Sequence, residues 1–286
     1  MKAPLLLALL LPALAAGIAS RPDAAPLAVM TFNIRYDNPD DGAFRWSARR
    51  ASLSGAILRQ SPDLIGMQEV LHRQLSDLAA DLPAYAHVGV GREDGGTRGE
   101  YSPIFYRRDR LALLATGTFW LSETPDRPGK GWDAACERLV TWARLREIPD
   151  GRVFYLFNTH FDHVGRLARR QSAALLKERI REIAGQSPVI VTGDFNATAD
   201  DETVCALVNP ADPDHLADAL ALAIDFAGPR HSYQNFGRLP DERRTLIDYI
   251  FVKNTGTVAS ARVLDHVATS GYISDHYPLL VKLQVN

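Results

Sequence analysis

The sequence contains short apolar runs, rich in β-branched and aromatic residues, distributed along nearly its whole length. Such runs predict β-strands, and three longer segments between them predict helices at Ala48–Arg59, His72–Leu82 and Arg166–Ala184. No repeat, low-complexity tract or linker divides residues 20–286. Strands and helices mixed within one large unit indicate an α/β or α+β layered fold. The predicted strands are Leu27–Phe32, Leu64–Met67, Ile104–Tyr106, Leu111–Phe119, Leu139–Leu145, Val153–Asn158, Val189–Val191, Leu246–Val252 and Leu279–Leu283.

The first residues have the order typical of a secretory signal. Lys2 is followed by an apolar run from Leu5 to Leu14 and then by small residues, so we expect cleavage after Ala19, with Ala15 as the alternative. No later segment is long and apolar enough to predict a transmembrane helix. We therefore expect residues 1–19 to be a signal peptide and residues 20–286 to be one exported catalytic domain, periplasmic or extracellular and monomeric.

The charge balance counts against one class of partner. The chain has 34 acidic and 32 basic residues, whereas a protein that depends on non-specific duplex binding usually carries a basic face.

Cys136 and Cys205 are the only cysteines. Export permits a disulfide between them, but the sequence does not decide whether they pair. No phosphate loop, complete dinucleotide loop or His-Glu-x-x-His motif is present.

Polar clusters lie at or beside the ends of the predicted strands. The most informative is Gly193-Asp194-Phe195-Asn196, because alternate side chains of an extended backbone share a face and Asp194 and Asn196 can point into one site. The other clusters are Thr31-Phe32-Asn33, Gly66-Met67-Gln68-Glu69, Glu100, Asn158-Thr159-His160, Asp248 and Ser274-Asp275-His276-Tyr277-Pro278.

Each cluster also has a simpler interpretation. Asn33 alone is typical of a turn, Glu69 of a helix cap and His160 of a buried core histidine. Their joint occurrence beside successive strands favours catalysis. Several carboxylates around one point repel each other unless a cation or proton joins them. Oxygen ligands without thiolates suit Mg²⁺ or Mn²⁺ better than zinc, and such an ion beside imidazoles suits phosphoester cleavage.

Taken in order, these motifs resemble those of the endonuclease/exonuclease/phosphatase superfamily over nearly the whole mature chain. The continuation of His160 into Phe161-Asp162-His163 is similar to the deadenylase and nocturnin-like branch. The resemblance implies a four-layer α/β/β/α sandwich of two packed mixed sheets flanked by helices, as in deoxyribonuclease. It places the site at one end of the sheets.

The resemblance also implies roles for individual residues. Glu69 is expected to be the principal ligand of Mg²⁺ or Mn²⁺, with Asn33 and Asp275 nearby. Asp194, supported by Asn196, is expected to orient or deprotonate the attacking water.

Two histidines complete the expected site. His276, held by Asp248, is expected to contact the phosphate, and His160, paired with Glu100, to stabilise or protonate the leaving oxygen. A carboxylate beside each histidine is expected to favour its charged form.

Other residues are candidates for contact with substrate. Asp162 and His163 could serve a second metal or the substrate, or belong only to a surface loop, and Trp46 and Arg49 could line the site or pack at a helix start. The candidate substrate-binding set is Arg49, Asp162, His163, Asn235 and Arg244.

The leading hypothesis is a secreted, Mg²⁺-dependent phosphoesterase that uses in-line attack of water on a phosphodiester or phosphomonoester. Its substrate could be a lipid headgroup, a small phosphodiester or nucleic acid, with a weak preference for a small or non-nucleic-acid substrate. One alternative is a nuclease, either an RNA 3′–5′ exonuclease or a DNA endonuclease. Another is a non-catalytic binding or virulence module that retains the fold.

Overall fold

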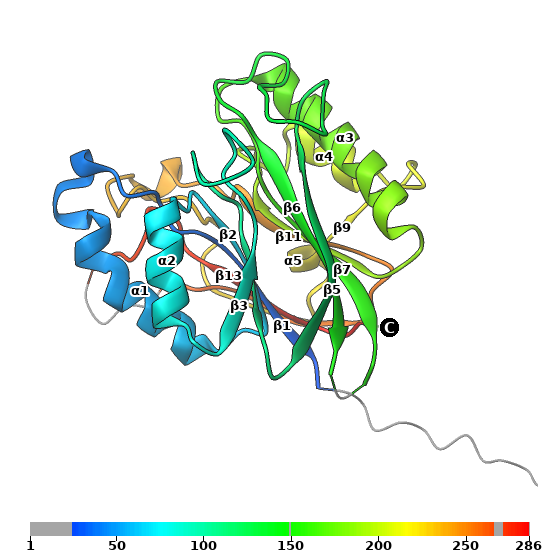
Figure 1. The fold of residues 1–286 in the computed structure, drawn as a ribbon, viewed down its shortest axis with the longest axis horizontal. Coiled ribbons are helices and arrows are strands. Elements are labelled where there is room, and N and C mark those ends of the chain that lie inside the picture. The colour runs from blue at the N-terminus through cyan, green and yellow to red at the C-terminus, as the bar shows by residue number, and fades with distance from the viewer. Residues whose placement is uncertain (1–24, 149, 266–270, 286) are drawn as a thin grey trace, which may run out of the picture.

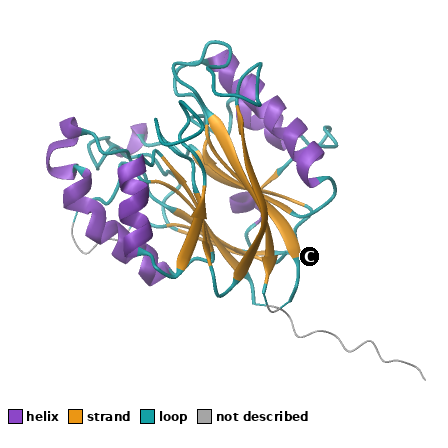
Figure 2. Cartoon of the chain, viewed as in Figure 1, coloured by secondary structure: helices purple, strands orange, loops and turns teal. Residues whose placement is uncertain are grey.

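Two mixed β-sheets pack face to face with helices on their outer faces (Figures 1 and 2). The computed structural model describes residues 25–148, 150–265 and 271–285, so the expected signal peptide lies outside the described residues. The first sheet has the spatial order β10 (Asp225–Ala227), β12 (Val258–Val263), β13 (Leu279–Leu283), β1 (Leu27–Asn33), β2 (Leu64–Gln68), β4 (Ile104–Arg107) and β3 (Tyr85–Val88). The second has the order β5 (Leu111–Trp120), β6 (Leu139–Glu147), β7 (Val153–His160), β8 (Val189–Asp194), β11 (Asp248–Lys253) and β9 (Ala217–Asp218).

The central strands, such as β2 and β8, are buried along their whole length because the sheets are covered on both sides there. In β1, Val29 belongs to the core between the sheets, whereas Met30 and Phe32 pack under the helices. This alternation follows from the period of two along a strand. In the second sheet, Leu156 likewise faces the inter-sheet core and its neighbour Phe157 faces outward.

The helices lie on opposite sides of the sandwich (Figure 1). The helices α1 (Trp46–Gln60) and α2 (His72–Asp81) cover the first sheet, and α3 (Arg166–Ala184) and α4 (Glu202–Val208) cover the second. The short α5 (Ala219–Leu222) contributes to the core between the sheets. Two 3₁₀ turns, Pro39–Phe44 and Asp241–Arg243, lie in the loops.

The two sheets approach closely at Gly66. A Cβ at this position would lie 2.0 Å from Thr192 Oγ1 and 2.5 Å from Asn158 Oδ1. The Asn158 amide donates across the interface to the carbonyls of Met67 and Pro103, at 2.7 and 2.9 Å. Asn158 therefore joins the sheets just below the site, and only a glycine at position 66 leaves room for it.

The expected sandwich is confirmed, as are the three predicted helices, whose ends differ by at most two residues. The elements that the sequence did not predict are β3, β9, β10, β12, α4 and α5. Most of these are short, and β12 has a polar, partly exposed pattern that lacks a continuous apolar run. Among the described residues, no helix is long and apolar enough to cross a membrane.

Candidate active site

The topology brings the polar strand ends to one edge of the sandwich. β1 and β2 are parallel, as are β7 and β8, so the carboxyl ends of the two strands in each pair meet. β11 runs antiparallel to β8 and begins with Asp248 paired to Asp194. The segment that carries Asp275 and His276 enters β13 antiparallel to β1, on the same side. Residues from the two ends of the chain, such as Arg35 and His276, therefore line one cavity.

This cavity has a volume of about 460 Å³. Its lining combines carboxylates, histidines, arginines and two tyrosines. The lining residues are Arg35, Tyr36, Glu69, Arg92, Glu100, Cys136, Arg138, His160, His163, Asp194, Asn196, Tyr233, Ile247, Asp275 and His276.

Of the expected metal ligands, Glu69 and Asp275 line the cavity, whereas Asn33 is buried beside it and does not. The Asn33 amide donates to Glu69 Oε1 at 3.0 Å and to Asp194 Oδ2 at 2.9 Å, so it joins the metal side to the expected base. Asp275 and Glu69 lie on either side of the Arg35 guanidinium, whose Nη1 is 3.8 and 4.0 Å from their carboxylates. Glu69, Asp275 and the Asn33 carbonyl offer only oxygen donors, which fits a hard divalent cation.

Asp194, Asp248 and His276 form a buried triad beside these ligands. His276 Nδ1 is 2.7 Å from Asp248 Oδ2, and His276 Nε2 is 3.8 Å from Asp194 Oδ2. Burial lowers the pKa of His276, but the charges of Asp248 and Asp194 outweigh it and raise that pKa to about 10. Burial and the charge of Asp248 raise the pKa of Asp194 to about 7. His276 is therefore cationic, as expected, and Asp194 has the pKa of a general base working near neutrality.

His160 differs from the expectation. Its Nδ1 is 4.0 Å from Glu100, and Glu100 instead accepts a hydrogen bond from Arg92 at 2.7 Å. Burial, followed by the charges of Arg138 and Arg92, lowers the pKa of His160 well below its ordinary value. The expectation of a charged His160 is therefore wrong. Burial, and then the charges of Arg138 and Arg92, disfavour the imidazolium, so the ring is neutral.

Asn196 supports His160 more directly than it supports Asp194. Its side-chain amide is 3.0 Å from His160 Nε2 and donates to the Phe161 carbonyl at 3.0 Å, while its backbone N–H donates to Asp194 Oδ1. Asn196 and Glu69 both have positive φ, 49° and 61°. Non-glycine residues in this strained region are common at functional sites, where the surrounding contacts hold them.

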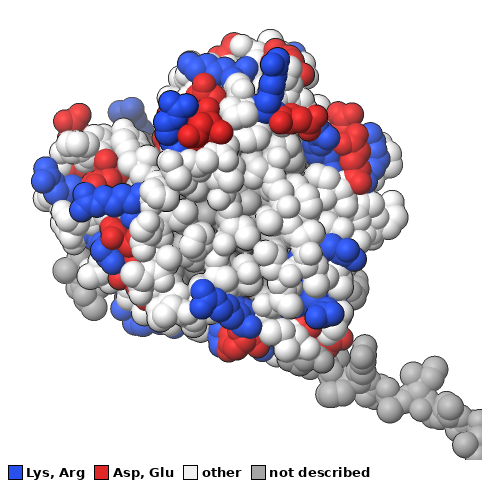
Figure 3. Space-filling view, viewed as in Figure 1, with Lys and Arg blue, Asp and Glu red and all other residues white. Residues whose placement is uncertain are grey.

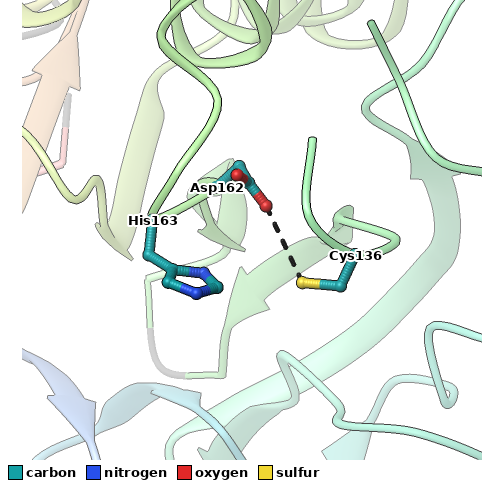
Figure 4. Close-up of side chains that lie close together, drawn as sticks. All are labelled: Cys136, Asp162 and His163. Carbon is teal, nitrogen blue, oxygen red and sulfur yellow. Dashed lines mark hydrogen bonds between the residues drawn. The ribbon is translucent and has the colours of Figure 1, made fainter. Parts of the chain in front are cut away.

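A second group of side chains lies near the same cavity (Figure 4). Cys136 Sγ is 3.7 Å from Asp162 Oδ2, and His163 lies beside them. Cys136 and His163 line the cavity, whereas Asp162 is buried behind them and bonds to the backbone N–H groups of Val164 and Gly165. Both cysteines of the chain are free thiols, so the disulfide that export would permit does not form.

Besides Asp162, three candidate substrate-binding residues do not line the cavity. The buried Arg49 donates to backbone carbonyls, including those of Phe44, Arg35 and Ile273, and so holds the loops beside the site. Arg244 pairs with Asp241 at 2.7 Å and donates to Leu239, and Asn235 contributes backbone groups to a turn.

Of the two interpretations of Trp46, lining the site or packing at a helix start, the structure supports packing. It begins α1 and donates through its indole N–H to Asp77 at 2.8 Å. Its side chain is buried under the first sheet rather than in the cavity.

Several cavity residues were not predicted from the sequence. Arg35 follows the Asn33 motif by two residues, and this short spacing is a signal that could have found it. Arg92, Arg138 and Tyr36 carry no motif, and their positions depend on loop contacts. Tyr233 lies in the loop between β10 and β11, and the centroid of its ring is 5.0 Å from that of His276.

The fold and the site together define a hydrolase of phosphoester bonds. Residues 30–276 match the model of the Endonuclease/Exonuclease/phosphatase family, and the chain belongs to this family. It is therefore an enzyme, which excludes the non-catalytic module considered above. Divalent-metal dependence is typical of the family. One group of side chains that could hold an ion, Asp194, Asp248 and His276, lies at this edge.

Solved structures agree over nearly the whole chain. An endonuclease/exonuclease/phosphatase from Bacteroides vulgatus is 41% identical with a TM-score of 0.87, covering 92% of this chain and 100% of that one. A mannosyl-6-phosphatase from Bacteroides thetaiotaomicron is 34% identical with a TM-score of 0.84, covering 90% and 99%. By sequence alone, the chain is also similar to nocturnin from Drosophila melanogaster, with 28% identity over 166 residues, which are 54% of this chain and 25% of that protein.

Proposed function

We propose that this chain is an exported, Mg²⁺-dependent phosphatase that hydrolyses a small phosphoester by in-line attack of water. The observation that carries the proposal is that Glu69, Asp275, Asp194 and His276 line one cavity. The buried Asn33 amide links two of them, Glu69 and Asp194. A cavity of about 460 Å³ suits a small molecule. The similarity to a mannosyl-6-phosphatase supports a phosphomonoester, such as a sugar phosphate.

The residues divide the chemistry between two sides of the phosphate. Asp194, oriented by Asn33, accepts the proton of the attacking water, and its pKa of about 7 keeps it competent near neutral pH. His276 stays cationic beside Asp248 and stabilises charge on the phosphoryl oxygens. Mg²⁺ held by Glu69, Asn33 and Asp275 would supply Lewis-acid stabilisation of the same charge.

Neutral groups lie on the side of the phosphate where the leaving oxygen departs. His160 and the Asn196 amide lie 3.0 Å apart and face the cavity together. Because His160 is neutral, it contributes a hydrogen bond to the leaving oxygen rather than a fully charged acid. Asn196 fixes the ring by binding one of its nitrogens.

The charge distribution supports a small substrate over duplex nucleic acid. The face in Figure 3 has basic and acidic side chains interspersed, with wide uncharged areas between them. The net charge is −2. A nuclease acting on long DNA or RNA would gain much of its affinity from a continuous basic surface.

A substrate panel tests this proposal. Purified protein is assayed with Mg²⁺ on hexose 6-phosphates, bis-(p-nitrophenyl) phosphate, sphingomyelin, RNA and plasmid DNA. We expect hydrolysis of small phosphoesters and its loss in Asp194→Ala and His276→Ala. Efficient nicking of plasmid at low enzyme concentration, or unchanged rates in either variant, would overturn it.

Export is tested separately. We propose that residues 1–19 are removed during secretion, so the mature chain begins at Ser20. N-terminal sequencing of the protein recovered outside the cytoplasm measures this. Recovery of the chain only in the cytoplasm with Met1 intact would contradict it.

A further inference from the structure

At the end of the cavity formed by Arg92, Glu100, Arg138 and His163, the two arginines influence the ionisation of His160, but no role in binding the substrate has been assigned to these residues. We propose that His163 is a specificity-determining residue that donates a hydrogen bond to a neutral hydroxyl of the leaving group, and that Arg138 positions it. The inference rests on the proposed function. It assigns the leaving group to the class of neutral polyols, such as a sugar carrying a single phosphate.

The contact with Arg138 fixes which His163 nitrogen carries the proton. Arg138 Nη2 lies 2.9 Å from His163 Nδ1. A guanidinium can only donate, so Nδ1 accepts and the proton of the neutral ring is on Nε2. Burial and the charge of Arg138 lower the pKa of His163, which keeps the ring neutral. The exposed His163 lines the cavity and therefore offers it an N–H donor.

Arg138 is held in place by the buried Asp162. Its side chain is 5% exposed, and its Nε is 3.4 Å from Asp162 Oδ2. Asp162 also accepts from the backbone N–H groups of Ala135, Val164 and Gly165, at 3.1, 3.0 and 2.7 Å. These bonds fix the loop that carries His163.

The same contacts argue against a metal in this group. Cys136, Asp162 and His163 lie close enough together to share an ion (Figure 4). However, the Asp162 carboxylate is already occupied by several donors, and the Arg138 guanidinium binds both Asp162 and His163 Nδ1. A cation would have to displace a buried arginine and at least two hydrogen bonds.

Charge balance at this end favours a neutral group over a second phosphate. Arg138 pairs with Asp162, and Arg92 pairs with Glu100 at 2.7 Å. Each guanidinium thus has a carboxylate partner, and His163 is neutral. A second phosphate would meet the Glu100 carboxylate, and both guanidinium groups at this end already have a carboxylate partner. A hydroxyl, in contrast, can accept from His163 and donate to Glu100.

The test compares substrates that differ only at the leaving group. We measure kcat and KM with Mg²⁺ for a hexose 6-phosphate, the corresponding 1,6-bisphosphate and phenyl phosphate. The phenyl ring of the last carries no hydroxyl that His163 could bind. The variants are His163→Ala, His163→Gln, which retains an N–H donor, and Arg138→Gln. Val164→Ala, an exposed substitution in the same loop, is the matched control.

We expect His163→Ala to lower kcat/KM for the hexose monophosphate roughly tenfold relative to phenyl phosphate, mainly through KM, as expected for one lost hydrogen bond. His163→Gln should recover most of this ratio, Arg138→Gln should lower it, and Val164→Ala should leave it unchanged. Wild type should prefer the monophosphate to the bisphosphate.

The outcomes separate the two proposals. An equal loss on both substrates in His163→Ala, or a preference of wild type for the bisphosphate, overturns the inference. Wild type that hydrolyses phenyl phosphate but not the hexose phosphate overturns the inference alone. Wild type that hydrolyses no phosphoester overturns the proposed function and the inference together.

Discussion

Asp162 provides a quantitative test of how the loop beside the cavity is held. Asp162→Asn nearly preserves the shape of the side chain, but it removes the charge that compensates Arg138. It also replaces one acceptor oxygen with an NH₂ group, which is a donor. That group would then face other donors, namely the Ala135 N–H, the Cys136 thiol and Arg138 Nε.

The pKa of Asp162 sets the expected magnitude. Burial alone would raise this pKa, but bonds from the backbone N–H groups of Gly165, Val164 and Ala135, together with the charge of Arg138, lower it from 3.8 to about 2. Each pKa unit is worth about 1.4 kcal/mol, so the ionised form contributes roughly 2.5 kcal/mol at pH 7. The free energy of unfolding should fall by about 3 kcal/mol in the variant, once the uncompensated Arg138 is included.

The pH dependence follows from the sign of the shift. Because the folded-state pKa is lowered, the contribution is fully present above about pH 5 and is lost as the pH falls towards 2. Urea unfolding of wild type and variant between pH 7 and pH 3 measures it. The difference in unfolding free energy should be constant down to about pH 5 and then shrink.

A matched control separates this effect from a general loss of charge. Asp126 pairs with Arg179 at 2.8 Å but is 87% exposed, so Asp126→Asn should change the stability little. Asp162→Asn protein as stable as wild type at pH 7 would refute the reasoning. So would a deficit that stays constant on acidification.

Three further outcomes are expected. Gly66→Ala should destabilise the fold by more than about 3 kcal/mol in urea unfolding, because its Cβ would meet Thr192 Oγ1 at 2.0 Å, whereas Gly129→Ala has open space and should be neutral. Arg49→Ala should lower the free energy of unfolding by at least about 3 kcal/mol, since several buried carbonyls lose their donor; an unchanged urea midpoint would contradict this. Mg²⁺ at about 100 times its Kd should stabilise wild type by roughly 2.7 kcal/mol in a thermal scan, and Glu69→Gln should abolish the shift; an equal shift in both proteins would argue against Glu69 as a ligand.

The strand-end motifs were predictable because chain topology leaves them few alternatives. Once β1, β2, β7 and β8 form parallel pairs, the polar residues that follow them must meet at one edge. Asn33, Glu69, His160 and Asp194 could therefore be grouped from their positions in the sequence alone.

The arginines were not predictable in the same way. The sequence suggested substrate contact for Arg49, yet its donors are used by backbone carbonyls of neighbouring loops. Arg92 and Arg138 carry no motif, but they change the ionisation of His160 and occupy the space beside His163. Such roles depend on which distant loops meet, and local sequence does not encode that.

The central claim is that Glu69 and its neighbours hold a divalent cation that makes this site a phosphoester hydrolase. The most direct measurement is kcat/KM for a small phosphoester as a function of Mg²⁺ concentration, in wild type and in Glu69→Gln. We predict saturable activation of wild type, loss of activity with chelator, and a decrease of roughly a thousandfold in Glu69→Gln. Hydrolysis that persists in chelator, or a Glu69→Gln variant with the Mg²⁺ response of wild type, would contradict the claim.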